Sequence, residues 1–196
     1  MITLRGALLP IACAVALLSS HLHGQETGAN TVLTGIQGLP WGSTREQWEA
    51  KFGAADSVHT RGDTVNLVYV NQSFLRQQAT HMDVLVAPGG GVTSVAYLFQ
   101  RTPGDCLVTF GKAVAAVSAE YPGLRPTEPD ILIEGTPAAD SAQACRQFAS
   151  RPQARLVAAQ TLRDPTGPGS VWLFTTVSSR GMILVIDLKA AQRPRR

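Results

Sequence analysis

The chain has 196 residues, 44% hydrophobic and 16% charged, which is typical of one globular domain and excludes a wholly disordered chain. Its formal net charge is +3, but four basic residues, Lys189, Arg193, Arg195 and Arg196, lie in the last eight positions. The rest of the chain has no basic excess, which excludes a globally basic surface of the kind that binds nucleic acids.

Residues 1–24 have the pattern of a secretory signal peptide. Arg5 gives a positive start, residues 7–18 are almost entirely apolar, and residues 19–24 become small and polar. The apolar run is too short for a membrane-spanning helix, which needs about 20 residues, and no later run approaches that length. The sequence therefore predicts export to the periplasm or the medium, with Gly24 as the preferred cleavage position and no transmembrane segment in the mature chain.

Cys13 raises the alternative of a lipid anchor. The residues before it, Pro10-Ile11-Ala12, lack the leucine expected three positions before a lipidated cysteine. Lipidation at Cys13 would also cut the apolar run in half. A soluble product is therefore favoured, with the lipid-anchored protein as the alternative.

Three further regions follow the predicted signal peptide. Residues 25–34 are polar and predict a flexible lead-in, residues 35–188 carry the patterns of a single domain, and residues 189–196 form a basic tail. The tail is interpreted as a solvated, disordered terminus. The alternative is a weak contact with an anionic surface through its four basic side chains.

The first ordered segment is a short helix from about Thr44 to Phe52. Ser43 and Glu46 have the spacing of a capping box, in which each side chain accepts a hydrogen bond from the backbone N–H at the other position. Trp48 lies four residues before Phe52 on one helix face, and Gly53 supplies the C-terminal stop. Trp48 is therefore predicted to be a core residue.

A first β-meander is predicted next from three segments with period-two alternation: Thr64–Asn71, Thr80–Ala87 and Val92–Arg101. A shorter strand is expected around Ser57–Thr60, with a turn at Arg61-Gly62-Asp63. In the third segment, Val95, Tyr97 and Phe99 are expected to share the buried face.

A second helix is predicted to begin at Pro103, with Thr102 as its cap. Apolar residues then recur at steps of three and four: Leu107, Phe110, Val114, Val117 and Tyr121. This amphipathic helix is expected to pack on the sheet and to end at Pro122-Gly123.

The remainder of the chain predicts a second meander. Residues 124–139 predict an irregular crossing with a short strand at Asp130–Glu134, and a short helix is expected over Asp140–Ser150. Three closing strands follow: Arg155–Arg163, Ser170–Ser178 and Gly181–Leu188. Runs of strands separated by single helices predict an α+β fold, with antiparallel β-meanders packed against two main helices. Any duplication into two helix-plus-sheet halves is faint, without a residue-level repeat.

Cys106 and Cys145 are the two cysteines that remain after removal of the predicted signal peptide. In an oxidising compartment, such a pair predicts one disulfide bond. A metal site is the competing interpretation, but neither His59 nor His81 lies at ligand spacing from a cysteine. No metal ion or other cofactor is expected.

The segment from Leu39 to Trp48, LPWGSTREQW, closes at Phe52-Gly53 and resembles a helix start of small exported bacterial proteins. Similar elements open the helices of outer-membrane assembly lipoproteins of the SmpA/OmlA type and of β-lactamase-inhibitor-like proteins. The resemblance implies an exported bacterial α+β protein. It carries over no functional residue, since this chain lacks the lipidated cysteine of the first group and the acidic pocket-plugging loop of the second.

Catalytic motifs are missing from the sequence. It contains no nucleophile elbow, no His-Glu-x-x-His and no phosphate-binding glycine loop before a helix. His59 and His81 are the neutral-pH bases of the predicted mature chain. His81 and Asp83 alternate onto the same side of a strand and form a conceivable pair, and Asp187 lies within an apolar run. A half-exposed histidine and a strand end are the simpler interpretations, so we expect no enzyme.

Large aromatic side chains indicate a binding surface instead. Trp172 and Phe174 alternate with the apolar Val171 and Leu173, which predicts a central strand with one face under a helix and the other open to a partner. Trp41, in a turn beside a helix cap, is the third candidate. The sequence therefore predicts a non-catalytic protein-interaction module of the cell envelope. The alternative is a soluble inhibitor of a secreted enzyme or a carrier of a small apolar ligand.

Overall fold

The computed structural model of the protein describes four stretches of the chain: residues 33–102, 106–151, 153–167 and 169–190. The predicted signal peptide lies outside the described residues, as do Arg193, Arg195 and Arg196 of the predicted tail. Leu33, near the end of the predicted lead-in, is buried, so the packed domain extends at least to this residue. Among the described residues, no helix is long and apolar enough to cross a membrane.

Ten strands form one antiparallel sheet in the order β11-β10-β12-β13-β14-β8-β7-β4-β3, and β9 also pairs with β12. Their bounds are β3 Ser57–Arg61, β4 Thr64–Val70, β7 His81–Val86, β8 Val92–Arg101, β9 Arg125–Pro126, β10 Asp130–Ile133, β11 Thr136–Pro137, β12 Leu156–Arg163, β13 Ser170–Ser178 and β14 Gly181–Lys189. Two small hairpins lie outside the sheet: β1 (Gly35–Ile36) with β2 (Leu39–Pro40), and β5 (Ser73–Phe74) with β6 (Gln77–Gln78).

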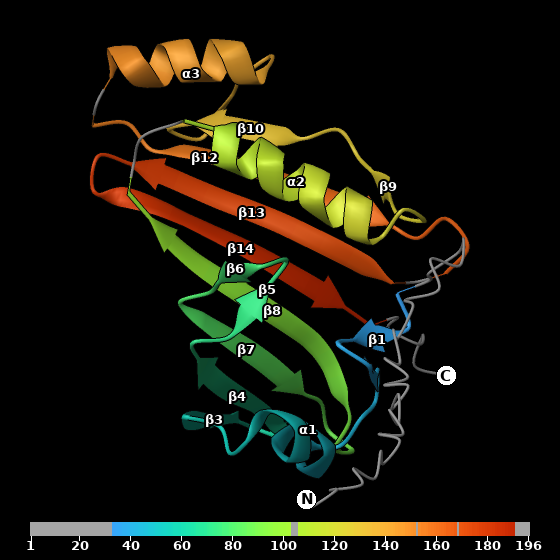
Figure 1. The fold of residues 1–196 in the computed structure, drawn as a ribbon. Coiled ribbons are helices and arrows are strands. Elements are labelled where there is room, and N and C mark those ends of the chain that lie inside the picture. Colours follow the sequence, from blue (N-terminus) through green and yellow to red (C-terminus); the bar gives the residue numbers. More distant parts are fainter. Residues whose placement is uncertain (1–32, 103–105, 152, 168, 191–196) are drawn as a thin grey trace, which may run out of the picture.

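The helices lie on one side of the sheet: α1 (Arg45–Phe52), α2 (Val108–Glu120) and α3 (Ser141–Ser150). The Phe52 ring of α1 contacts Tyr69 of β4, with ring centroids 6.1 Å apart. The helix α2 crosses β12 and β13, and α3 lies against β10 near the sheet edge (Figure 1). The β5–β6 hairpin covers the middle of the same side, where Phe74 stacks on Tyr97.

The order of the elements divides the sheet into two similar halves. In the first half, α1 precedes β3, β4, β7 and β8; in the second, α2 precedes β10, β12, β13 and β14. Each set of four strands is an antiparallel meander whose last strand lies at the centre of the sheet. The halves join where β14 pairs with β8 (Figure 1). A duplication that is faint in the sequence is therefore plain in the topology.

The core fills the layer between the helices and the sheet. In β8, Val95, Tyr97 and Phe99 are buried, which confirms their predicted shared face. In β13, Val171 and Leu173 are fully buried on the same side of the sheet. Since burying a large apolar side chain stabilises the fold by about 1.5–3 kcal/mol, this layer holds the sheet in place. The predicted α+β class with antiparallel meanders is confirmed.

The first helix uses a different cap from the one predicted. Thr44 is the N-cap: its Oγ1 accepts a hydrogen bond from the Gln47 N–H at 3.4 Å, and Gln47 Oε1 accepts one from the Thr44 N–H at 2.8 Å. Ser43 is buried, and its hydroxyl donates to the Pro40 carbonyl. The sequence holds two overlapping capping boxes, and the turn that buries Ser43 selects the second. Gly53 ends the helix with a φ of 84°, as predicted.

Thr44→Ala should lower the free energy of unfolding by about 1 kcal/mol, because it leaves an N–H at the start of α1 without its acceptor. Urea denaturation measures the change. Glu46→Ala is the matched control and should cost about half as much or less, through the helix dipole and the exposed hydrogen bond between Glu46 and the Thr44 side chain. If Glu46→Ala costs more than Thr44→Ala, the Ser43 box operates and our assignment of the cap is wrong.

The second helix starts later than predicted. The helix α2 begins at Val108, after Leu107, which makes no capping hydrogen bond. Cys106 has a φ of 52°, a left-handed conformation that a right-handed helix cannot contain. Pro103 lies outside the described residues. The prediction that the helix starts there, with Thr102 as cap, is nonetheless wrong, because the backbone at Cys106 interrupts the helix and α2 starts at Val108.

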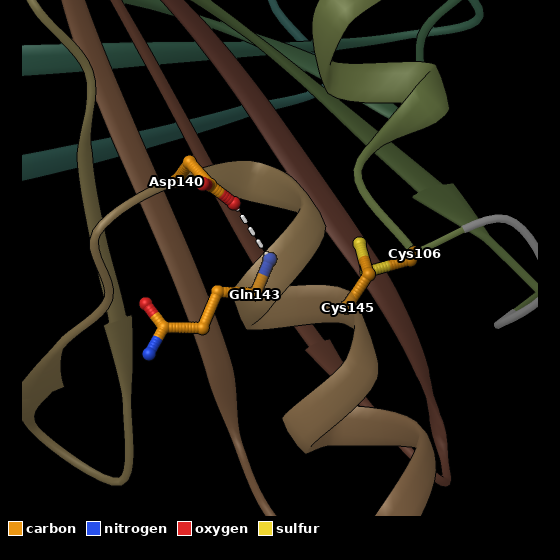
Figure 2. The surroundings of a disulfide bond; sticks show 4 residues. All are labelled: Cys106, Asp140, Gln143 and Cys145. Atoms are coloured by element: carbon orange, nitrogen blue, oxygen red, sulfur yellow. Dashed lines mark hydrogen bonds between the residues drawn. A yellow bond between two sulfur atoms is a disulfide. The ribbon is translucent and has the colours of Figure 1, made fainter.

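A disulfide bond joins α3 to the start of α2, as predicted. Cys106 and Cys145 are 39 residues apart in sequence, with Cα atoms 5.9 Å apart. Figure 2 shows Cys145 on the part of α3 that faces Cys106, close to the N-cap Asp140, whose Oδ1 accepts a hydrogen bond from the Gln143 N–H at 2.7 Å. In α3 only Ala144 is buried. The bond is therefore a major attachment of α3 to the domain.

Candidate interaction surface

The sheet side opposite the helices is called the open face below. It carries the alternate residues of the central strands, and no described element covers it (Figure 1). Three apolar side chains form a row across adjacent strands, since Phe174 of β13 pairs with Val185 of β14, which pairs with Leu98 of β8. On the same face, Ile183 and Leu85 are 37% and 38% exposed. The open face therefore carries an apolar patch in contact with solvent.

Trp172 and Phe174 form a stacked pair on the open face, called the aromatic pair below. Their ring centroids are 5.2 Å apart, with an interplanar angle of 21°. Lys189 places its Nζ 5.7 Å from the centroid of the Trp172 ring. Because Lys189 pairs with Ser170, it lies on the side of Trp172 that is away from Phe174. Both faces of the indole are occupied, so the pair presents ring edges to solvent.

Asp187 holds Lys189 above the tryptophan. Its Oδ2 lies 3.0 Å from Lys189 Nζ, and its Oδ1 accepts a hydrogen bond from Ser94 Oγ at 2.6 Å. The Asp187 side chain is 14% exposed and pairs across the strands with Trp172. Asp187 is therefore a shielded, fully partnered carboxylate that fixes one side of the aromatic pair.

His81 and Asp83 are brought together as their spacing predicted, with Nε2 and Oδ2 3.4 Å apart. Asn66 Nδ2 donates to the other Asp83 oxygen at 3.2 Å. His59 lies apart from this pair and contacts Ser57 Oγ at 3.3 Å. The described residues thus connect neither histidine to both a hydroxyl and a carboxylate, the arrangement that activates a serine nucleophile. Nor do they contain a group of three His, Cys, Asp or Glu side chains that could hold a metal ion.

Two adjoining hollows lie in the open face beside the aromatic pair. The larger, of 660 Å³, opens over β3, β4, β7 and β8, and the other, of 500 Å³, lies over the ends of β13, β14 and β8. They share Leu85 and Ser94. The larger hollow is lined by His59, Thr60, Arg61, Thr64, Asn66, Asp83, Leu85, Ser94 and Ala96. Most of these side chains are polar, so the hollows can offer hydrogen bonds to a polar partner.

Trp41 does not join the aromatic pair. It packs against the buried core, and its indole Nε1 donates to the Leu33 carbonyl at 2.8 Å. The structure therefore brings together two of the three predicted partner-binding residues, Trp172 and Phe174, and places the third elsewhere. Lys189, assigned to the tail by the sequence, belongs to β14 and contributes to the open face.

Several residues of the open face were not singled out from the sequence. Leu98 lies between the buried Tyr97 and Phe99 and so faces away from the core, and Val185 alternates with Leu184 and Ile186 in the same way. Their alternation was a usable signal. In β8 the predicted buried face of Val95, Tyr97 and Phe99 already placed Leu98 on the opposite side. In β14 apolar residues fall on both faces, which leaves open which face the helices cover.

Comparison with known protein families, with curated proteins and with solved structures found no match. The resemblance of residues 39–53 to two groups of exported proteins therefore stays a prediction. The function must be argued from the open face itself.

Proposed function

We propose that the protein is an exported, non-catalytic interaction module of the bacterial cell envelope, whose open face binds another protein. One observation carries the proposal. The helices lie on one side of a ten-stranded sheet, and the other side leaves the aromatic pair, Val185 and Leu98 without a covering element among the described residues. A sheet with an apolar face normally buries it, and an exposed apolar patch on a folded domain marks an interaction site.

The aromatic pair is suited to anchor a partner. Trp172 is held from one side by Phe174 and from the other by Lys189, so little side-chain freedom remains to be lost on binding. Buried aromatic side chains of this kind dominate the binding energy of many interfaces. The pair therefore supplies a preorganised apolar anchor.

The hollows beside the aromatic pair favour a protein over a small apolar ligand. Both are open to solvent and neither is an enclosed cavity. A carrier of apolar molecules needs an enclosed, apolar cavity, whereas a protein loop can use exposed hydrogen-bonding groups. An inhibitor of a secreted enzyme would use the same face, with the enzyme as the partner.

Two observations support export. Disulfides such as Cys106–Cys145 form and persist in oxidising compartments outside the cytoplasm. Residues 1–24, which lie outside the described residues, have the sequence pattern of a signal peptide. Both favour a periplasmic or secreted location.

Site-specific photocrosslinking in intact bacteria tests the interaction face. A photoreactive amino acid in place of Ile183 or Leu85, on the open face, should give an adduct of one common size. The same amino acid in place of Val108, which is 53% exposed on α2, should give none. Equal adducts from all three positions, or none from the open face, would contradict the proposal.

Once the crosslink has identified the partner, its affinity for the Trp172→Ala variant measures how much the aromatic pair contributes to binding. The substitution should weaken binding by about 30-fold or more, which corresponds to the roughly 2 kcal/mol of an interface hot spot. Val108→Ala, the control on the helix side, should bind as the unchanged protein does. Both variants should keep the far-ultraviolet circular dichroism of the unchanged protein, because neither side chain belongs to the buried core. A folded Trp172→Ala variant with undiminished affinity would remove the aromatic pair from the interface.

A further inference from the structure

The edge strand β3 is exposed on both of its faces. The sheet ends at β3, which pairs with β4 on one side only (Figure 1). Four of its five residues are exposed, including Val58 on the helix side and His59 on the open face. The outer side of β3 is therefore accessible to another strand.

The backbone groups on that outer side belong to Val58 and Thr60. The turn that joins β3 to β4 has two residues, and Arg61 pairs directly with Thr64 across it. Residues that flank such a turn exchange backbone hydrogen bonds, and bonded pairs alternate with non-bonded ones along an antiparallel ladder. Val58 and Thr60 therefore turn their N–H and C=O groups away from β4. Among the described residues, these groups have no partner.

The opposite edge of the sheet is closed to pairing. Its outer strands, β9 and β11, have two residues each, and both contain a proline. Thr136 pairs with Ile133 across a two-residue turn, so the next residue, Pro137, turns outward a nitrogen that carries no hydrogen. Short edge strands and prolines block the addition of a strand, whereas β3 has five residues and no proline.

We propose that β3 pairs with β3 of a second copy of this chain, in an antiparallel two-fold dimer with one continuous sheet. Because each copy has a single open edge, pairing between copies closes at two chains and cannot grow into a filament. With His59 opposite His59 of the second copy, Val58 of each chain faces Thr60 of the other. Each such pair can exchange two backbone hydrogen bonds, so this register uses every outward group of the strand.

The side chains of β3 permit this register. Arg61 lies opposite the uncharged Ser57 of the second copy, so no lysine, arginine or carboxylate of the strand faces one of like sign. On the helix side, Val58 lies against Thr60 of the second copy, which covers an apolar side chain that is 41% exposed in the single chain.

The dimer does not depend on the proposed function. Four strands separate β3 from β13, which carries the aromatic pair, so the two lie about 24 Å apart across the sheet. Because the two-fold axis of such a pair is perpendicular to the sheet, both open faces lie on the same side. The dimer would therefore present two aromatic pairs to one partner surface. Trp172→Ala should dimerise as the unchanged protein does.

Sedimentation velocity of the purified protein, over a range of concentrations, tests the dimer. We expect the mass of two chains at high concentration, with slow hydrogen exchange at the Val58 and Thr60 amides that becomes fast on dilution. The His59 amide, which bonds to β4, should be protected in both states. A protein that is monomeric at every concentration, or a dimer whose Val58 and Thr60 amides exchange fast, overturns the proposal.

Charge at position 59 tests the register. His59→Lys and His59→Glu should each abolish the dimer, because the two-fold axis places the new charge opposite itself. A mixture of the two variants should dimerise again, since opposite charges then face each other. Gln100→Lys, which adds the same charge on the open face of β8, is the matched control and should dimerise normally. Circular dichroism should show every variant folded, because the replaced side chains are exposed. A mixture that stays monomeric, or an equal loss in Gln100→Lys, contradicts the proposed dimer.

Discussion

A variant with both Cys106→Ser and Cys145→Ser will lose about 4 kcal/mol of unfolding free energy. The bond links residues 39 positions apart, and in the chain-entropy description a cross-link of that span restricts the unfolded chain by about this amount at 25 °C. Urea denaturation of the unchanged protein and the variant measures the difference. The unchanged protein in a thiol reductant should unfold at the same urea concentration as the variant.

Without the disulfide, local unfolding should begin at α3. Besides the disulfide, α3 is held by buried Ala144, by half-buried Phe148 and by its contact with β10, a small area for a helix at the sheet edge. Amide hydrogen exchange in the Cys-free variant should therefore accelerate in α3 more than in β13, which lies at the centre of the sheet. Two results would show that packing rather than the disulfide holds α3. One is a loss of less than about 1 kcal/mol of unfolding free energy, and the other is an equal acceleration of amide exchange in α3 and β13.

Trp48→Ala will cost about 3–5 kcal/mol, the range for truncating a buried aromatic side chain. Trp48 is 1% exposed, and its ring stacks on Phe52 with centroids 5.0 Å apart. It is the buried residue of the short helix α1 and belongs to the core cluster, so its loss removes the helix's largest buried side chain from the core. The drop in urea midpoint, at an unchanged denaturant slope, measures the cost.

Trp48→Phe separates the ring from its polar group. The indole Nε1 has no hydrogen-bond partner, so replacing it removes no hydrogen bond, and only the smaller volume should matter. We expect a loss well below that of Trp48→Ala. If Trp48→Phe and Trp48→Ala lose the same free energy of unfolding, the indole N–H matters more than the packing of the ring. An interior water or another acceptor must then bind that N–H.

The sequence patterns predicted those elements whose signal is local. The strands β8 and β13 match the predicted bounds, because alternation runs through their whole length. The α1 cap was misplaced by one residue because two overlapping capping boxes satisfy the same rule. The start of α2 was missed because the backbone conformation of Cys106 depends on its tertiary surroundings. No local pattern contains that information.

The candidate surface was predictable in part. The alternation of Trp172 with Leu173 correctly indicated a strand with two apolar faces, and the spacing of His81 and Asp83 indicated their contact. The pairing of β14 with β8, which completes the row of Phe174, Val185 and Leu98, joins segments far apart in the sequence. Local patterns do not specify such a partner. The position of Lys189 over Trp172 comes instead from the hairpin of β13 and β14.

The seam between β8 and β14 has a consequence for how the chain folds. Ser94 and Asp187, which meet across it, are 93 residues apart, whereas each half is built from strands that are neighbours along the chain. Until β14 has been made, β8 is a ten-residue edge strand with apolar side chains on both faces, the kind of edge that recruits strands from other molecules. The strand β14, which follows β8 in chain order by about 80 residues, is therefore the one that protects this edge from aggregation.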